Sequence, residues 1–238
     1  MPIRFAYHPG NVAHSSAPEV DETMRAACRS LDIELIDMPG ATSCGAGILG
    51  QANRRLQITL NARTMSIAED LGMDIITPCA TTAATLFEDL MMLKADSSLM
   101  GEVNRTLEKT TGRVLEGSIK IRHLLQVILE EIGIENFSKK VKNPIPSPLA
   151  PYYGPNLQQV GLIGGDDVFD PWYMESVIEA GGGDPIRYAS RTSSAGTPGI
   201  FSEEQTVLRQ SANILSDAKT MGARMICLLY TSDAADDP

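Results

Sequence analysis

The residues best suited to chemistry in this chain of 238 residues are its four cysteines, Cys28, Cys44, Cys79 and Cys227. Their irregular spacing includes no CxxC, so it predicts neither a disulfide framework nor a zinc site. Cys28 is expected on the buried face of a helix, as a small hydrophobe. Cys44 and Cys79 are expected in loops near the carboxyl ends of strands, where open α/β sheets bind ligands. These two thiols are the candidate catalytic and cofactor-binding residues, and two inert thiols remain the alternative.

Histidines offer further metal ligands. His8 and His14 flank the first loop and could join Cys44 and Cys79 around one metal ion, but the spacing does not require this. Histidines in turns are more often structural, so no metal is expected. His123 is expected to pack between helices.

Two other patterns carry weaker signals. Gly45–Gly50 reads G-x-G-x-x-G, but a dinucleotide fingerprint should begin directly after the first strand, and this one follows the second strand after a long loop. A tight loop explains these glycines better. Ser193 and Ser194 could supply a nucleophile, yet no histidine follows them in the second half.

The composition limits the classes of function. The hydrophobic fraction of 43% and the charged fraction of 21% are typical of a globular protein. Twenty basic against thirty acidic residues give a net charge of −10, which predicts neither nucleic acid nor a membrane as a partner. The sequence contains no apolar run of the roughly 18 residues that span a bilayer, and it begins without a secretory signal pattern. The expected location is the cytoplasm.

The elements that position these residues alternate along the first 93 residues. Strands are expected at 3–7, 33–36 and 74–77, and helices at 21–31, 52–71 and 78–93. Connections of this length require right-handed crossovers and a parallel sheet. The segment 94–148 contains two helical patterns, Leu99–Lys109 and Ile121–Ile132, and ends in a proline-rich linker.

The second half repeats the opening. Leu149–Pro155 is similar to Phe5–Asn11, and Thr192–Gly196 is laid out like Thr42–Ala46. A helix at 171–180, a strand at 185–188, a helix at 202–221 and a strand at 223–226 complete the copy. The sequence therefore predicts an α/β fold of two pseudo-symmetric βαβαβ domains, 1–93 and 149–226, joined by a helical segment at 94–148. The second domain is expected to be truncated.

Three segments together resemble the cysteine-rich CCG domain of the heterodisulfide reductase B-subunit family. They are Tyr7–Asn11, Thr42–Ala46 and Ile76–Thr82, and the similarity extends through Ile119–Leu125 and Ala150–Gly154 to about residue 226. The resemblance implies two CCG-type domains and thiol–disulfide redox chemistry. It also implies noncubane [4Fe-4S] clusters on the CCG motifs and a ferredoxin-like C subunit, among other subunits, as partner.

The chain departs from the family pattern at the cluster ligands. The five cysteine positions of the first motif hold Asn11, Ser43, Cys44, Cys79 and Thr82. Three cysteine positions of the second motif hold Pro155, Ser193 and Ser194. Iron–sulfur clusters are held by thiolates, typically four, and the hydroxyl, amide and proline side chains do not replace them. The clusters are expected to be absent, so no cofactor is predicted.

The expected function is therefore a scaffold or docking subunit of a heterodisulfide-reductase-type electron-transfer complex. One alternative is a residual redox enzyme that uses a Cys44/Cys79 dithiol or a minor metal site. Another is a module that binds a small thiol or disulfide ligand. Because Cys79 begins a helix, its thiol is expected to have a lowered pKa and to be the more reactive of the two.

The end of the chain has a separate interpretation. Residues 227–238 resemble the translation of a sequencing adapter, and they stand where the family has its final cysteine motif. They are expected to be a non-native tail that contributes nothing to stability.

Overall fold

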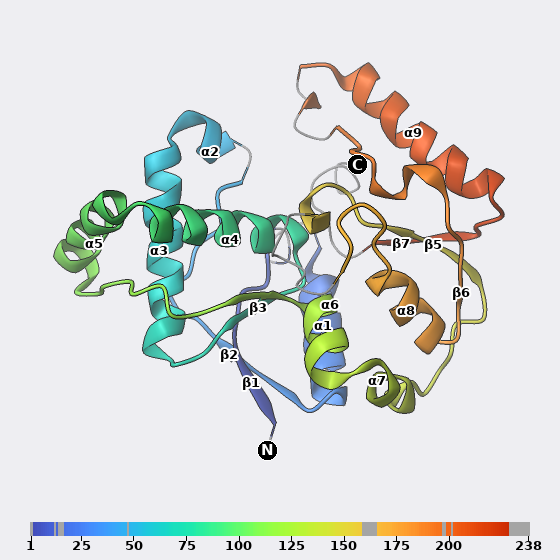
Figure 1. The fold of residues 1–238 in the computed structure, drawn as a ribbon, viewed down its shortest axis with the longest axis horizontal. Helices are drawn as coiled ribbons and strands as arrows, with labels where there is room; N and C mark the ends of the chain where they lie inside the picture. The colour runs from blue at the N-terminus through green and yellow to red at the C-terminus, as the bar shows by residue number, and fades with distance from the viewer. Residues whose placement is uncertain are drawn as a thin grey trace. The chain divides into compact units, whose positions relative to one another are not determined.

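The computed structural model describes residues 2–11, 13, 17–46, 48–158, 166–196, 199–200 and 202–228 (Figure 1). The chain divides into two compact units, residues 1–123 and 124–238. Each unit contains a parallel sheet with helices packed on it, which confirms the predicted α/β class with two βαβ-type domains. The division lies inside segment 94–148, so the first part of the expected connector belongs to the first unit.

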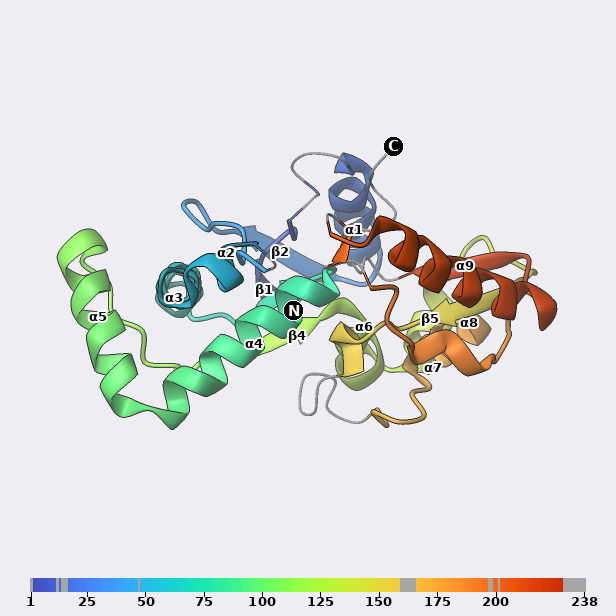
Figure 2. The same ribbon diagram turned by 90° about the horizontal axis from the view of Figure 1, so that it is seen from above.

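The first unit has a parallel sheet with the strand order β2-β1-β3-β4. Its strands are β1 (Ile3–Tyr7), β2 (Ile33–Asp37), β3 (Ile75–Thr77) and β4 (Ile121–His123). Its helices are α1 (Pro18–Ser30), α2 (Ile48–Ala52), α3 (Arg54–Asp70), α4 (Ala80–Ala95) and α5 (Ser97–Thr111). Helices α1 and α4 lie on opposite sides of this sheet (Figure 2). All three residues of β3 are buried, as expected for a central strand that is covered on both faces.

Capping side chains explain where the helices near the carboxyl edge of this sheet begin. The Asn53 side chain accepts the backbone N–H of Leu56 at 3.0 Å and starts α3. The Cys79 sulfur accepts the N–H of Thr82 at 3.3 Å and starts α4. Both contacts satisfy a donor that the first helical turn leaves without an intrahelical partner. A candidate thiol is thus also a structural helix cap.

The prediction of a single helix at Ile121–Ile132 is wrong. Its first three residues form β4, which pairs in parallel with β3 through Ile75–Ile121 and Thr77–His123. The chain then becomes helical in α6 (Leu124–Val127) and in a π-helical segment at Ile128–Ile132. Periodicity alone does not distinguish a short apolar strand from a helix, and here the open edge of β3 determines the outcome.

The second unit has a smaller parallel sheet with the order β6-β5-β7. Its strands are β5 (Pro148–Tyr152), β6 (Asp184–Pro185) and β7 (Met225–Leu228). The longer helices are α7 (Ile134–Lys140), α8 (Tyr173–Ala180) and α9 (Glu204–Thr220), with 3-10 turns at Asn156–Gln158 and Ala189–Thr192. One core cluster joins β5 to α9 through Ala150, Tyr152, Tyr188, Ile214 and Ala218.

The last strand, β7, includes the first residues of the expected tail. Strand β7 continues through Cys227 and Leu228, which pair with Pro151 and Tyr152. The first two residues of segment 227–238 therefore take part in the sheet. Residues 229–238 lie outside the described residues.

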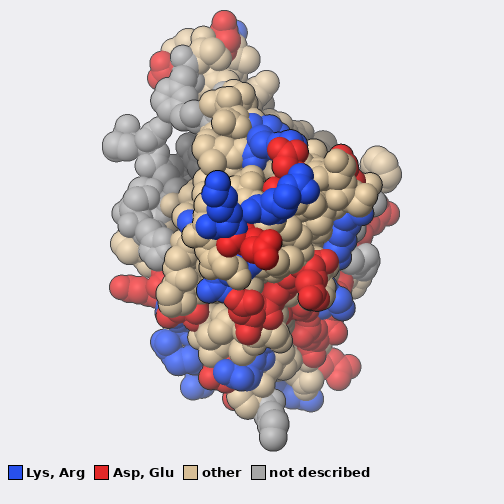
Figure 3. Space-filling model, turned by 90° about the vertical axis from the view of Figure 1, so that its left-hand side faces the viewer, with Lys and Arg blue, Asp and Glu red and all other residues tan. Residues whose placement is uncertain are grey.

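The surface of the first unit mixes charges of both signs. Figure 3 shows the face that carries α3 and α5, where acidic and basic side chains lie next to one another. Ion pairs join Arg54 of α3 to Glu88 of α4 at 3.1 Å and Arg55 of α3 to Glu102 of α5. Within the described ranges, no helix is long and apolar enough to cross a membrane.

Candidate functional site

The carboxyl edge of the first sheet brings together the five positions of the first motif. Asn11 follows β1, Ser43 and Cys44 follow β2, and Cys79 and Thr82 follow β3. Because the three strands are parallel and adjacent, their carboxyl ends meet at one edge. Residues separated by up to 71 positions in the sequence therefore form one cluster, which we call the edge cluster.

Cys44 lies at the centre of the edge cluster. Its sulfur accepts a hydrogen bond from Asn11 Nδ2 at 3.3 Å, and Thr82 Oγ1 lies 3.6 Å from it as a donor. The Ser43 hydroxyl donates to Asn11 Oδ1 at 2.8 Å and so holds the asparagine in place. Cys44 itself is fully buried, whereas Ser43 is exposed. An amide and a hydroxyl group thus contact this sulfur, at positions where the resemblance implies thiolates.

Cys79 is buried beside the same threonine. Its sulfur accepts the Thr82 N–H at 3.3 Å, and the Thr82 hydroxyl and the backbone N–H of Asn11 also approach it. Burial nevertheless raises the pKa of Cys79 to about 11, and a neighbouring Cys44 thiolate would raise it further. The expectation of a lowered pKa is wrong, because desolvation of the thiolate outweighs the hydrogen bonds at the start of α4.

Cys28 serves as an internal reference for this thiol. It is fully buried on α1, as predicted, with its sulfur 3.9 Å from Met24 Sδ, and burial raises its pKa to about 11. At pH 7 only about one thiol in 10,000 is ionised when the pKa is near 11. Cys28 and Cys79 should therefore be equally unreactive.

We expect iodoacetamide to modify Cys79 at pH 7 no faster than Cys28 in the folded chain, since neither thiol is appreciably ionised or exposed. Peptide mass spectrometry after timed quenching measures both rates, and the chain unfolded in urea is the control in which both react quickly. A tenfold faster reaction at Cys79 would mean that its environment activates the thiol.

The histidines have structural roles in this unit. His8 Nδ1 accepts the N–H of Gly10 at 3.1 Å, which leaves the proton on Nε2 to be donated to the Thr42 carbonyl at 3.0 Å. Both nitrogens are thus occupied in joining the first two loops, so His8 does not act as the metal ligand considered above. His14 lies outside the described residues.

His123 is not an interhelical residue, contrary to the prediction, but the last residue of β4. Its Nε2 donates to the Pro78 carbonyl at 2.9 Å and so holds the turn that leads into Cys79. Complete burial lowers the pKa of His123 to about 4, only partly offset by this hydrogen bond, so the ring is neutral at pH 7.

A buried polar chain that the sequence motifs do not reveal lies behind Cys44. Asn61 of α3 donates through Nδ2 to the Cys44 carbonyl at 3.0 Å and to Asp89 Oδ2 at 2.6 Å. Asp89 of α4 is completely buried, and Arg54 approaches its Oδ1 at 2.7 Å. Burial raises the pKa of Asp89, while Asn61 and Arg54 oppose that shift. In the sequence, the acidic Asp89 among the apolar positions of α4 is the signal that could have revealed this buried polar chain.

The glycines after Cys44 form a tight loop, in agreement with their interpretation above. Gly45 has φ +68°, and a Cβ there would lie 2.7 Å from Leu49 Cδ2. A Cβ at Gly50 would lie 2.3 Å from Gln57 Oε1. Gly47 lies outside the described residues. The left-handed backbone at Gly45 thus favours glycine, whereas a side chain at Gly50 would displace the end of the Gln57 side chain.

The second unit has no thiols at the corresponding loop positions. Pro155, Ser193 and Ser194 are exposed, and the Ser194 hydroxyl accepts the N–H of Gly196 at 3.1 Å. Tyr152 OH donates to the Ser193 carbonyl at 2.9 Å and fixes this loop at the end of β5. Cys227 lies in β7, and burial raises its pKa.

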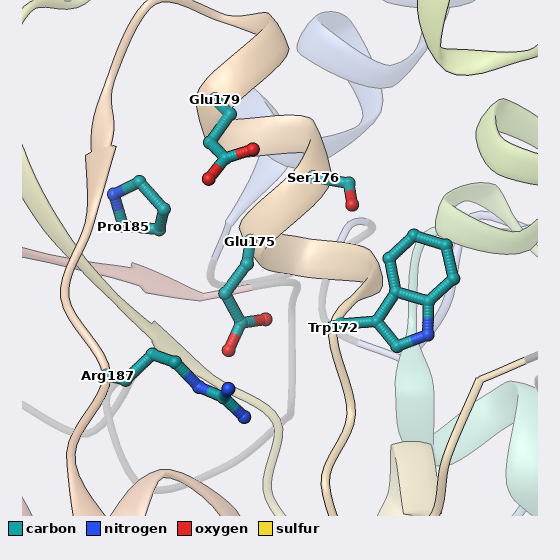
Figure 4. A pocket seen from close by; sticks show the side chains of 6 residues that line it. All are labelled: Trp172, Glu175, Ser176, Glu179, Pro185 and Arg187. Carbon is teal, nitrogen blue, oxygen red and sulfur yellow. The ribbon is translucent and has the colours of Figure 1, made fainter.

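Ionic side chains occupy the neighbourhood of α8 instead. The buried Glu175 accepts a hydrogen bond from Tyr153 OH and forms an ion pair with Arg191 at 3.3 Å. Asp170 pairs with both Arg191 and Arg187. The adjacent cavity of about 310 Å³ is lined by Trp172, Glu175, Ser176, Glu179, Pro185 and Arg187 (Figure 4). The six residues that line the cavity offer hydrogen bonds and charge, and none of these six is a soft metal ligand.

Among the described residues, no group of three or more His, Cys, Asp or Glu side chains is arranged to hold a metal ion. The edge cluster has two free thiols, and its other members are neutral amide and hydroxyl groups.

Comparison with known proteins points to one family. A family model described as a cysteine-rich domain, CCG, matches residues 5–86, the segment that supplies the whole edge cluster. The B subunit of the ferredoxin:CoB-CoM heterodisulfide reductase of Methanosarcina mazei is 24% identical over 194 residues, which are 80% of this chain and 64% of that protein. The 8-methylmenaquinol:fumarate reductase membrane anchor subunit of Wolinella succinogenes is 24% identical over 95% of this chain and 78% of its own length.

A solved structure gives the same fold. A hypothetical protein from Helicobacter pylori aligns with a TM-score of 0.68 at 15% identity, over 95% of this chain and 41% of that one.

The B subunit of the ferredoxin/F(420)H(2)-dependent CoB-CoM heterodisulfide reductase of Methanosarcina acetivorans is 23% identical, again over 64% of its length. The chain thus spans slightly less than two thirds of these B subunits. Residues 5–86 match the CCG cysteine-rich domain, and the chain as a whole is similar to heterodisulfide reductase B subunits.

Proposed function

We propose that this chain is a B-subunit-like component of a cytoplasmic thiol/disulfide electron-transfer complex and acts there as a scaffold or docking subunit. Its homology to heterodisulfide reductase B subunits supports the class of complex. A ferredoxin-like C subunit and a cysteine-complete B subunit are the proposed partners. The observation that carries the docking role is the donor set of the edge cluster.

The family's four-iron cluster does not fit the residues that are present. The five positions meet around Cys44, but only two of them carry sulfur, and Asn11 and Thr82 contact the Cys44 sulfur as hydrogen-bond donors. A four-iron cluster is typically held by four thiolates, and neutral amides and hydroxyls bind iron of this kind weakly. Electron transfer through such a cluster is therefore not part of the proposed function of this chain.

A residual dithiol is the second candidate, since Thr82 contacts both Cys44 and Cys79. A disulfide between them requires Cα atoms within about 7 Å and a thiolate to attack the oxidised partner. Burial and the raised pKa of Cys79 oppose that attack. The docking role is favoured for this reason.

Purification of the tagged full chain from its source organism tests the docking role. We expect a ferredoxin-like subunit and a cysteine-complete B subunit to copurify in amounts equal to the chain, as judged by quantitative mass spectrometry. The double variant Cys44→Ala/Cys79→Ala should retain both partners, because docking does not use the buried thiols.

Three results would count against docking. Recovery of the chain alone, or of partners outside electron-transfer complexes, contradicts the proposed role. Loss of the partners from a folded Cys44→Ala/Cys79→Ala variant would instead favour chemistry at the dithiol. Circular dichroism of each variant establishes that it is folded.

A further inference from the structure

The two thiols of the edge cluster are placed to share a ligand smaller than a four-iron cluster. We infer that Cys44 and Cys79 bind one soft monovalent metal ion, for which Cu(I) is the biological example, between their sulfur atoms. The assignment names the metal of the minor site considered above, and it rests on the proposal that this chain holds no four-iron cluster.

Thr82 contacts both sulfur atoms, which places the two sulfurs close to each other. Its hydroxyl oxygen lies 3.6 Å from Cys44 Sγ, and its backbone N–H donates to Cys79 Sγ at 3.3 Å. The two sulfurs are thus neighbours of one residue in the first turn of α4, and both are free thiols with no exposed surface.

The number and type of ligands select the metal. Thiolates are soft donors and prefer Cu(I), zinc or iron–sulfur clusters. Structural zinc sites are almost always four-coordinate, and two thiolates with amide and hydroxyl neighbours do not supply that set. Cu(I) accepts two thiolates as its complete coordination, so the edge cluster matches it without a third sulfur.

The surrounding donors suit the charge of such a complex. Two thiols and one Cu(I) give a bis-thiolate complex with a single negative charge and release two protons. Asn11 Nδ2 already points at Cys44 Sγ, at 3.3 Å, and the Thr82 N–H points at Cys79 Sγ. Hydrogen bonds of this kind stabilise a buried anion, and they also orient the ligands as outer-shell partners of a metal.

The residues next to the site reach the protein surface. Ser43 is exposed and donates to Asn11 Oδ1 at 2.8 Å, and the half-buried Asn11 donates to the Cys44 sulfur at 3.3 Å. Because a buried metal site needs an entry path, this is the side of the site from which we expect the ion to enter.

Anaerobic titration of the reduced full chain with Cu(I), in competition with a chromophoric Cu(I) chelator, tests the inference. We expect one Cu(I) per chain, and X-ray absorption should report two sulfur neighbours. Cys44→Ala and Cys79→Ala should each lower the affinity by at least about 100-fold, because one of two ligand bonds is lost. Thr82→Val, which removes only the hydroxyl, should lower it by about 10-fold.

The controls use cysteines outside the edge cluster. Cys28→Ala and Cys227→Ser should leave the affinity unchanged, and thermal melting without metal establishes that each variant is folded. The site assignment is overturned if Cys44→Ala/Cys79→Ala binds like the parent chain, if three or more sulfurs surround the metal, or if the chelator removes all Cu(I). Iron and sulfide are measured in the same samples. If the chain holds a four-iron cluster, both iron and sulfide are found, and the proposal that the chain lacks the cluster fails. If neither is found and Cu(I) does not bind, only the copper assignment fails.

Discussion

The triple variant Asn11→Cys/Ser43→Cys/Thr82→Cys should take up a four-iron cluster, which we do not expect in the unchanged chain. These three positions already meet around Cys44, as the contacts of its sulfur with Asn11 and Thr82 and the bond from Ser43 to Asn11 establish. The substitutions would place five thiols in one cluster, enough for the four thiolates that such a group typically needs.

Anaerobic reconstitution with iron and sulfide provides the measurement. We expect the unchanged chain to retain well under one cluster per chain and the triple variant to retain several-fold more, with a cluster EPR signal after reduction or oxidation. Adding Cys44→Ala/Cys79→Ala to the triple variant is the matched control and should abolish the gain, because only three thiols remain. Stoichiometric iron and sulfide in the unchanged chain would instead show that the missing thiols are dispensable.

The first unit should lose stability as the pH falls from about 6.5 toward 4, through His123. This ring is fully buried, and its pKa is lowered to about 4 in the folded chain, against about 6.5 when unfolded. Between these values the unfolded chain binds the proton and the folded chain does not, so the free energy of unfolding decreases as the pH falls. The linkage amounts to about 2 kcal/mol at pH 5 relative to pH 7.

Urea unfolding at pH 7 and pH 5, followed by circular dichroism, measures this loss. His123→Gln is the comparison, because its side-chain amide can still donate to the Pro78 carbonyl that His123 Nε2 reaches at 2.9 Å, yet does not titrate. The variant should lose less stability than the parent between the two pH values, by about 2 kcal/mol. Equal losses in both proteins would mean that His123 is protonated without cost in the folded chain.

The sequence alone was sufficient to place Asn11, Cys44 and Cys79 of the edge cluster after the strands of the first sheet. The alternation of strands and helices over residues 1–93 requires a parallel sheet, and parallel strands end at a common edge. Asn11, Cys44 and Cys79 each follow one of these strands, so their convergence followed from connectivity. The same reasoning predicted the burial of Cys28 on the apolar side of its helix.

Other features depended on which surfaces meet in three dimensions. The strand β4 forms because the edge of β3 is open to Ile121–His123, which no local pattern reveals. Asn61 and Asp89 lie far from Cys44 in the sequence, and only the packing of α3 against α4 brings them behind its carbonyl. In the sequence, His8 is a candidate metal ligand. Only the structure shows that Gly10 and Thr42 occupy both of its ring nitrogens with hydrogen bonds.

The thiol of Cys79 shows most clearly which properties the sequence determines and which depend on the tertiary structure. Its position at the start of a helix could be predicted from Pro78 and the apolar pattern that follows, and the hydrogen bond from Thr82 N–H agrees with that position. A helix start favours a thiolate, whereas complete burial disfavours it, and only the packed structure determines that burial dominates and raises the pKa to about 11. Connectivity, which the sequence encodes locally, determined where the candidate residues lie. Their chemical state depends on solvent exclusion by distant segments, and this only the tertiary structure decided.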